Sequence, residues 1–307
     1  MRKSTAYHPA LQLVFLLLIS TVAALVFTVL GMLFWFAIDS HASLAILKSD
    51  ASLMNINFLR IMQISSTTGL FIAGPIAFSF LVKVKPVHYF YFDEQLKWSL
   101  FLMMIAIMFF SNPLLEWITA LNQKMSFPDA LKGLEAWMKE KEDQNDTLTK
   151  QLLVMKDWGA FSINLLMVAI LPAIGEELFF RGGIQNILRQ WFKNHHVAIW
   201  VTAIIFSAIH LQFYGFLPRM LLGTLFGYLL VYGKSIWLAI LGHFLNNGTA
   251  VVAAYILQRQ GKSIEQIDQM SSFSSVNYLI SAIITLVLII FFFYQTKKES
   301  THYEQLG

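Results

Sequence analysis

Long apolar segments separated by short polar ones occupy most of this chain of 307 residues. A helix needs about 20 mostly apolar residues to cross a bilayer, and eight segments approach or exceed that length. Pro218 and Arg219 lie between the fifth and sixth segments, which are short and are expected to be tilted or to form a tight hairpin. The predicted spans are residues 10–38, 58–82, 96–120, 152–175 (running on into the Glu176-Glu177 stretch), 197–213, 217–233, 235–257 and 276–294.

Residues 121–151 form the only long hydrophilic stretch between these segments. Leu131, Leu134, Trp137 and Met138 recur there at helical spacing, which predicts an amphipathic helix outside the bilayer, on the membrane surface or on neighbouring loops. The chain is therefore expected to divide into three N-terminal spans, the amphipathic helix, a core of four spans and a last span with its tail, at residues 1–120, 121–151, 152–258 and 259–307.

The composition supports an all-α polytopic membrane protein. Hydrophobic residues make up 57% of the chain and charged residues 13%, whereas soluble domains carry about 25% charged residues. The chain has no cysteine, which excludes disulfides, thiolate metal sites and cysteine nucleophiles. Lysines and arginines at membrane edges explain the net charge of +4, so nucleic-acid binding is not expected.

The charges near the two ends of the chain predict its orientation. Arg2 and Lys3 precede the first span, and Lys297 and Lys298 follow the last one, so both termini are expected in the cytoplasm. An even number of spans agrees with this arrangement. The apolar run 10–38 is longer than the roughly 7–15 residues of a signal-peptide core and is expected to remain as the first span. The compact, cysteine-free chain suggests a bacterial plasma membrane.

Two adjacent carboxylates and an arginine interrupt the fourth apolar segment. A charged side chain at the centre of a bilayer costs roughly 2.5–3.5 kcal/mol on insertion scales, so each such group requires a reason. Glu177 and Arg181 are four residues apart and can pair on one face of a helix. Glu176 is turned about 100° away from Glu177 and has no local cation. It is therefore a candidate reactive group.

Two further polar pairs lie in later spans. Phe206 and His210 are four residues apart, as are His243 and Asn247. Polar groups inside membranes face the bundle interior and pair with one another, so Glu176 and the two histidines are expected to meet. One glutamate and two histidines can bind a catalytic zinc ion that keeps an open position for water. The same groups also suit a metal-free hydrolase with a glutamate-activated water and a histidine–asparagine oxyanion site.

In this order and on these apolar segments, the three pairs resemble the motifs of the CPBP intramembrane proteases. That family includes the type II CAAX prenyl endopeptidases and bacterial proteins linked to bacteriocin immunity or processing. The resemblance covers roughly residues 150–255 and rests on the motifs Glu176-Glu177-x-x-x-Arg181, Phe206-x-x-x-His210 and His243-x-x-x-Asn247.

The resemblance implies an all-helical endopeptidase whose catalytic cavity is formed inside the membrane by the C-terminal half of the chain. Glu176 with His210 would activate water, and His243 with Asn247 would hold the oxyanion. Glu177, Arg181 and Phe206 would support them. One zinc ion bound by Glu176, His210 and His243 stays open as an alternative. The substrate would be a peptide or protein associated with the lipid bilayer.

Two other function classes fit the same residues. A proton- or cation-coupled transporter would use Glu176, His210 and His243 as a relay, although the chain lacks the paired broken spans of inverted repeats. A non-catalytic membrane scaffold or immunity protein would retain the motifs without cleavage. Peptide hydrolysis that depends on Glu176 separates the protease from both.

Some polar and small residues are expected to be structural. His195 and His196 lie at a predicted membrane edge, where solvated histidines are common. Gly223-x-x-x-Gly227 is a small-residue pattern that permits close helix packing. Nothing in the sequence decides whether Gln185 packs between helices or lines the cavity.

Overall fold

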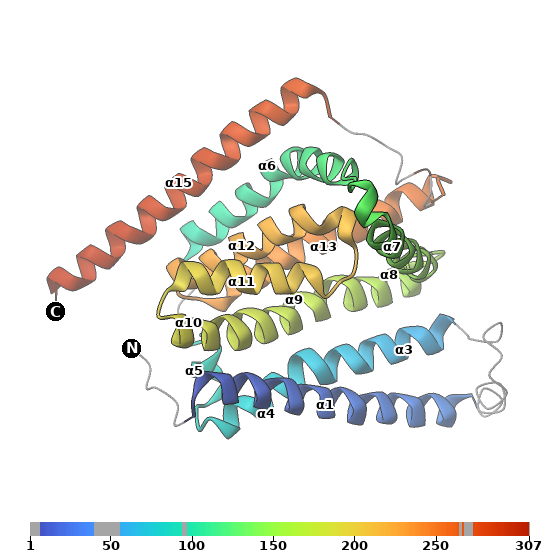
Figure 1. Ribbon diagram of the computed structural model, residues 1–307, viewed down its shortest axis with the longest axis horizontal. Helices are drawn as coiled ribbons and strands as arrows, with labels where there is room; N and C mark the ends of the chain where they lie inside the picture. The colour runs from blue at the N-terminus through green and yellow to red at the C-terminus, as the bar shows by residue number, and fades with distance from the viewer. Residues whose placement is uncertain (1–6, 40–55, 94–96, 264–265, 267–272, 307) are drawn as a thin grey trace.

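The protein is described by a computed structural model covering residues 7–39, 56–93, 97–263, 266 and 273–306, excluding the side chains of 298–306. All regular elements of these residues are helical. The helix α1 (Pro9–Ile38) begins at the end of the bundle where α15 (Ser275–Leu306) ends (Figure 1). The predictions on Arg2, Lys3 and Lys298 lie outside the described side chains, so cytoplasmic termini stay a prediction.

Seven helical segments of the described residues are long and apolar enough to cross a membrane, and an eighth, His195–Ala208, is shorter. The predicted all-α polytopic membrane fold is therefore confirmed. The seven segments are Pro9–Ile38, Ile56–Leu81, Trp98–Gln123, Trp158–Phe192, Phe213–Gly233, Ile236–Arg259 and Ser275–Lys297.

The fourth span differs from its predicted bounds of 152–175. It begins at Trp158, after the Asp157 carboxylate accepts a hydrogen bond from the Ala160 amide at 2.8 Å, and it continues to Phe192. The polar residues near Glu177 do not end the helix, because their charges are paired inside the bundle. Its successive parts are α8 (Trp158–Asn164), η4 (Leu165–Ile170), α9 (Leu171–Glu176), η5 (Glu177–Gln185) and α10 (Asn186–Phe192).

The fifth predicted span, 197–213, is also corrected. Its helix, α11 (His195–Ala208), ends five residues earlier than predicted. Leu211 then adopts a left-handed backbone conformation with φ of 52°, and the short 3₁₀ helix η6 (Phe213–Gly215) leads into α12 (Phe216–Gly233). The chain thus reverses in a tight hairpin, and His210 lies in the turn rather than on a helix.

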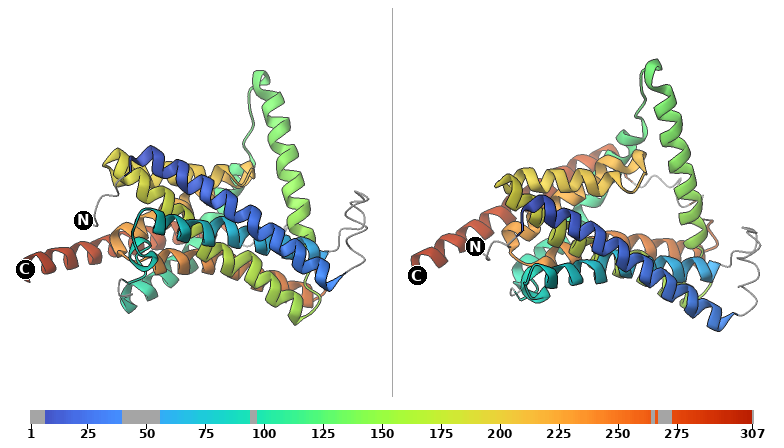
Figure 2. Two further views of the ribbon diagram at one scale, coloured as in Figure 1. Left: turned by 90° about the horizontal axis from the view of Figure 1, so that it is seen from below. Right: turned by 60° about the horizontal axis from the view of Figure 1, so that its bottom comes forward.

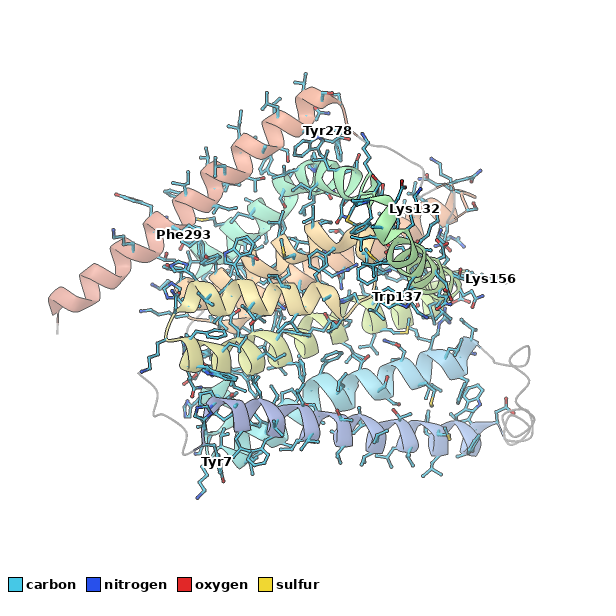
Figure 3. The ribbon with its side chains drawn as sticks, viewed as in Figure 1. Tyr7, Lys132, Trp137, Lys156, Tyr278 and Phe293 are labelled. Carbon is cyan, nitrogen blue, oxygen red and sulfur yellow. The ribbon has the colours of Figure 1, made fainter. Side chains whose placement is uncertain are left out.

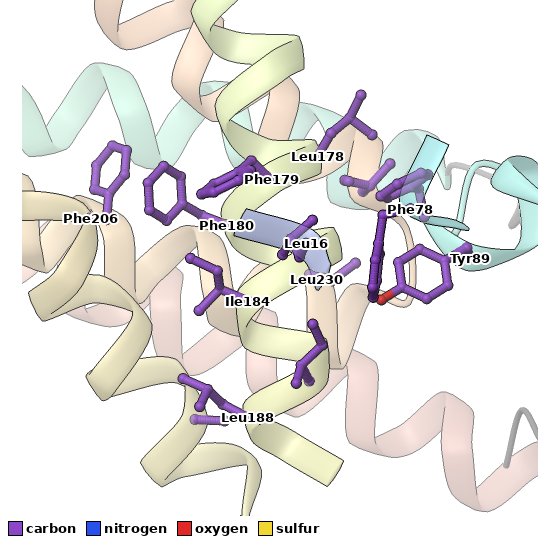
Figure 4. Packing of buried hydrophobic residues seen from close by; sticks show 14 of the residues in the cluster. Leu16, Phe78, Tyr89, Leu178, Phe179, Phe180, Ile184, Leu188, Phe206 and Leu230 are labelled. Carbon is purple, nitrogen blue, oxygen red and sulfur yellow. The ribbon is translucent and has the colours of Figure 1, made fainter. Parts of the chain in front are cut away.

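The bundle has three groups of helices (Figure 1). The first contains α1, α3 (Ile56–Thr67), η2 (Thr68–Ala73) and α4 (Gly74–Leu81). The central group runs from α8 to α13 (Ile236–Arg259), and α6 (Trp98–Gln123) and α15 form the third. Leu16 of α1 and Phe78 of α4 pack with Phe179 and Phe180 of η5 in one buried cluster (Figure 4). The first group therefore supports the helix that carries the two glutamates.

A serine of α15 completes the backbone hydrogen bonding of α6 beside its internal proline. The helix α6 continues through Pro113, which removes one backbone donor. The Ser281 hydroxyl accepts from the Leu114 amide at 3.0 Å and donates to the Phe110 carbonyl at 2.5 Å. In a regular helix that amide would donate directly to that carbonyl. Ser281 therefore bridges an opened turn and fixes α15 against α6.

The amphipathic helix predicted in 121–151 is present as α7 (Lys132–Leu152). It stands at a steep angle to the bundle (Figure 2), and its residues Lys132 and Trp137 are labelled in Figure 3. The buried Arg60 side chain of α3 donates to the Leu152 and Val154 carbonyls, both at 3.2 Å. Arg60 thus satisfies carbonyls at the C-terminal end of α7 and ties it to the N-terminal helices.

Candidate active site

The glutamate pair lies where the fourth span changes its helical form. Pro172 is the second residue of α9 (Leu171–Glu176), and the preceding turn widens into the π-helical segment η4, where the Leu171 amide donates to the Leu166 carbonyl five residues back. Glu176 is the last residue of α9, and Glu177 is the first of the second π-helical segment, η5. Such segments are uncommon and occur frequently at functional sites.

Glu177 joins the first and third sequence motifs. Its Oε2 atom lies 3.0 Å from Nε of Arg181, and its Oε1 atom lies 2.8 Å from Nδ1 of His243. The side chains of Glu177 and Arg181 are fully buried, so this is an ion pair without access to water. The sequence predicted the first contact from the four-residue spacing. It did not predict that the same carboxylate holds His243.

The guanidinium of Arg181 is enclosed by two aromatic rings and one carbonyl. Its central carbon lies 4.6 Å from the centre of the Phe206 ring and 5.6 Å from that of Phe226. Its Nη2 atom donates to the Gly223 carbonyl at 3.1 Å. Cation–π contacts of a desolvated arginine are favourable by about 2 kcal/mol. Phe206 therefore belongs to the site as a ring that covers the buried cation.

The Gly223-x-x-x-Gly227 pattern forms the opposite side of this arrangement. One turn beyond Arg181, Nε2 of Gln185 donates to the Gly227 carbonyl at 3.2 Å. A Cβ atom on Gly227 would lie 2.6 Å from Oε1 of Gln185, so the close approach requires glycine. The pattern thus serves packing within the chain, between α12 and η5, and Gln185 joins the two helices.

Glu176 and Glu177 approach His243 from different sides of its ring. Oε2 of Glu176 lies 3.9 Å from Nε2 of His243, and the Glu176 side chain keeps 14% of its surface exposed. His243 also stacks on Phe226, with ring centres 5.7 Å apart. With Nδ1 directed to Glu177, the ring presents Nε2 toward Glu176. The two adjacent glutamates therefore have different surroundings, one sealed and one partly accessible.

His210 occupies the turn after α11. Its Nδ1 atom lies 2.7 Å from the Phe206 carbonyl, which can only accept, so Nδ1 carries a proton. In the neutral ring Nε2 then has a free lone pair, the form required of a base. The His210 and Phe206 rings are in contact with centres 5.0 Å apart, and Phe206 also contacts His243 at 6.1 Å. Phe206 thus lies between the two histidines.

Asn247 is held through both ends of its amide. Its Nδ2 atom donates to the Val168 carbonyl in η4 at 2.9 Å, and its Oδ1 atom accepts from Asn246 at 3.0 Å. Each amide nitrogen carries two hydrogens, so one N–H of Asn247 remains beyond the bond to Val168. The bond from Asn246 thus orients the Asn247 amide.

Arg219 is a charged residue near the site that the sequence analysis treated only as a break between spans. Its guanidinium donates to the Gln212 side chain at 2.8 Å and to the Gln212 carbonyl at 3.3 Å. It lies close enough to Glu176 and to His210 to interact electrostatically with both. Little in the sequence assigns Arg219 to the site, because no acidic residue lies three or four positions away from it.

The amphipathic helix α7 contacts the turn that carries His210. Asn145 donates to the His210 carbonyl at 3.1 Å, and Gln212 donates to Asp146 at 3.4 Å. Glu142 accepts from the Tyr214 amide at 3.2 Å, and burial raises the pKa of the Glu142 carboxyl above its ordinary value. The Trp137 and Phe213 rings pack beside these bonds. The turn is therefore positioned from outside the span as well as from α11.

The three side chains expected for a zinc site were Glu176, His210 and His243. Within the described residues, no group of three or more His, Asp or Glu side chains is arranged to hold a metal ion. A tetrahedral zinc ion requires its donors about 2.0–2.2 Å away. A zinc ion bound by Glu176, His210 and His243 therefore stays a prediction, and no step below depends on one. An enclosed cavity among the four predicted catalytic side chains stays a prediction.

Comparison with known proteins agrees with the three motifs. Residues 158–249 match the family model described as type II CAAX prenyl endopeptidase, Rce1-like. The matched segment contains all seven motif residues, from Glu176 to Asn247, and the predicted resemblance is confirmed. No curated protein and no solved structure matches the chain.

Proposed function

We propose that the protein is an intramembrane endopeptidase that hydrolyses a peptide bond of a membrane-associated peptide or protein. The match of residues 158–249 to the Rce1-like type II CAAX prenyl endopeptidase model supports this class of activity. The observation that carries this proposal is the position of His243, between the sealed Glu177 and the partly accessible Glu176. A transporter relay requires no such division between neighbouring glutamates.

Glu176 and His210 are assigned to the activation of water. Glu176 keeps part of its side chain accessible, and His210 has Nε2 available as a proton acceptor because Nδ1 is held by Phe206. A water between these groups would lose a proton as its oxygen attacks the peptide carbonyl. The proton would then pass to the leaving amine, so that one group acts first as base and then as acid.

His243 and Asn247 are assigned to the oxyanion of the tetrahedral intermediate. Donation from Nε2 of His243 requires protons on both ring nitrogens, and the Glu177 carboxylate at Nδ1 is then the counter-ion. Arg181 keeps Glu177 ionised and in place. Asn247, oriented by Val168 and Asn246, has one remaining N–H to donate. Loss of one such donor typically lowers kcat about 10²–10³-fold.

Cleavage of a farnesylated peptide ending in a CAAX sequence, by purified full-length protein in detergent, tests the proposal. Glu176→Ala and His210→Ala should each abolish product formation while the thermal unfolding profile is retained. His196→Ala is the matched control, because His196 is an exposed histidine of α11 whose side chain hydrogen-bonds to Tyr228 and to none of the predicted site residues. Equal cleavage by Glu176→Ala and the unaltered protein would overturn the assignment.

A second test substrate, a membrane-anchored peptide without a prenyl group, shows whether peptide hydrolysis depends on the prenyl group. Cleavage of that peptide alone, lost in Glu176→Ala, supports the endopeptidase and assigns a different substrate class. Proton or cation flux into vesicles that depends on Glu176, without hydrolysis of either peptide, would instead identify a transporter.

A further inference from the structure

A small cationic cavity lies on the far side of Arg181 from the catalytic histidines. It has a volume of about 210 Å³ and is formed between the end of the fourth span and the end of α12. Its polar lining residues are Tyr91, Arg181, Gln185, Asn186, Arg189 and Lys234. At about 30 Å³ for each water, the cavity has room for roughly seven waters, or for one small anion and its hydration.

The lining carries three cations and, among the described residues, no carboxylate. Arg181 is neutralised by Glu177 on its other side. Arg189 donates from Nη2 to the Tyr91 hydroxyl at 2.8 Å and to Oδ1 of Asn186 at 3.0 Å, and both partners are neutral. Lys234 forms no ion pair with any described residue. Two positive charges therefore face one small cavity without compensation, which favours an anion there.

Two residues that line the cavity also carry buried polar atoms without partners among the described residues, Nη1 of Arg181 and Oε1 of Gln185. Both atoms are covered, so the cations that an anion in the cavity can reach are Arg189 and Lys234. A phosphate group has several anionic oxygens and can accept from an arginine and a lysine at the same time.

We propose that this cavity binds a phosphate group, either as free phosphate or as the phosphomonoester headgroup of a lipid. The cavity lies at the end of the bundle where Arg189 and Lys234 cluster, on the side predicted to be cytoplasmic. Basic pockets between membrane helices on that side bind phosphorylated lipid headgroups. A bound phosphate would connect Arg189 of α10 to Lys234 at the end of α12. Arg181 and Gln185 join the same span to α12 from the preceding segment, η5.

Binding of inorganic phosphate to the purified full chain tests the proposal without reference to proteolysis. The thermal midpoint is measured in phosphate-free detergent buffer with increasing phosphate, against chloride at equal ionic strength. A ligand that binds only the folded state raises the midpoint in a saturable manner. The double variant Arg189→Gln/Lys234→Gln should bind phosphate with an affinity at least about tenfold lower than that of the unaltered protein.

Lys193→Gln is the matched control. Lys193 is an exposed lysine that ends α10 at the same end of the molecule and does not line the cavity. This variant should bind phosphate as the unaltered protein does. The proposal is overturned if phosphate shifts the thermal midpoint of the double variant as much as that of the unaltered protein. It is also overturned if Lys193→Gln weakens phosphate binding as much as the double variant does, since either result indicates general charge screening. Midpoints without phosphate check that each variant is folded.

Nanodiscs separate the two sources of the phosphate group. If a lipid headgroup occupies the cavity, phosphatidic acid in the disc should raise the thermal midpoint of the unaltered protein, and free phosphate should then raise it no further. In the double variant, phosphatidic acid should leave the midpoint unchanged. If free phosphate is the ligand, its effect should persist in discs with and without phosphatidic acid. The absence of any effect from either source overturns the proposal.

Discussion

Glu177→Gln tests whether two adjacent glutamates have separate roles. Glu177 is fully buried, with one oxygen 3.0 Å from Arg181 and the other 2.8 Å from His243. Glutamine retains an acceptor for His243 but leaves the fully buried guanidinium of Arg181 without a counter-charge. Removing one partner of a buried pair destabilises by about 3–5 kcal/mol. At roughly 2–4 °C for each kcal/mol, the thermal midpoint should fall on the order of 10 °C.

The measurement is thermal unfolding of the purified protein in detergent, followed by intrinsic fluorescence, with Glu176→Gln as the matched variant. Glu176 keeps 14% of its side-chain surface exposed, and its Oε2 atom lies 3.9 Å from Nε2 of His243. Its substitution should therefore change the midpoint by less than about 2 °C while it abolishes cleavage. Arg181→Met combined with Glu177→Gln removes both charges and should recover most of the lost stability, because apolar replacement of a buried pair is often neutral. A midpoint for Glu177→Gln equal to that of Glu176→Gln would refute the reasoning.

Three further substitutions test the packing and the chemistry. Gly227→Ala places a methyl group 2.6 Å from Oε1 of Gln185 and should destabilise by about 1–3 kcal/mol in thermal unfolding, whereas Gly133→Ala, in open space on α7, should not. Ser281→Ala removes the bridge across the opened turn of α6 and should lower the free energy of unfolding by about 1–3 kcal/mol. Thr285→Val is the control on the same helix: its hydroxyl has no hydrogen-bond partner among the described residues, so the loss should be less than about 0.5 kcal/mol. Equal losses of unfolding free energy in the two variants would contradict the bridge. Asn247→Ala should lower kcat about 10²–10³-fold with little change in KM, and a change confined to KM would argue against an oxyanion role.

The sequence predicted the membrane spans well because their signal is local. About 20 apolar residues are sufficient to identify a span, whatever its neighbours are. The contact between Glu177 and Arg181 was predictable for the same reason, since four-residue spacing places two side chains on one helical face. The fourth span was expected to run on into the Glu176-Glu177 stretch, and the helix does continue through it, to Phe192. Its start was placed six residues too early because residues 152–157 directly precede the apolar run.

Contacts between distant helices were only partly predictable. Polar residues were expected to converge, and the structure places His243 beside both glutamates. The spacing of His243 and Asn247 gives them one helical face but does not specify which neighbour each one meets. Asn247 in fact bonds to the Val168 carbonyl. Backbone carbonyls, such as those of Gly223 and Gly227, have no sequence signal at all, although Arg181 and Gln185 depend on them.

The attachment of α7 at two places connects the N-terminal helices to the turn of His210. Arg60 holds its C-terminal end to the N-terminal helices, and Asn145, Asp146 and Glu142 hold its middle to that turn. The hydrophilic helix therefore acts as a strut between two parts of the bundle that are far apart in the sequence. A displacement of α3 would be transmitted through α7 to the backbone of His210.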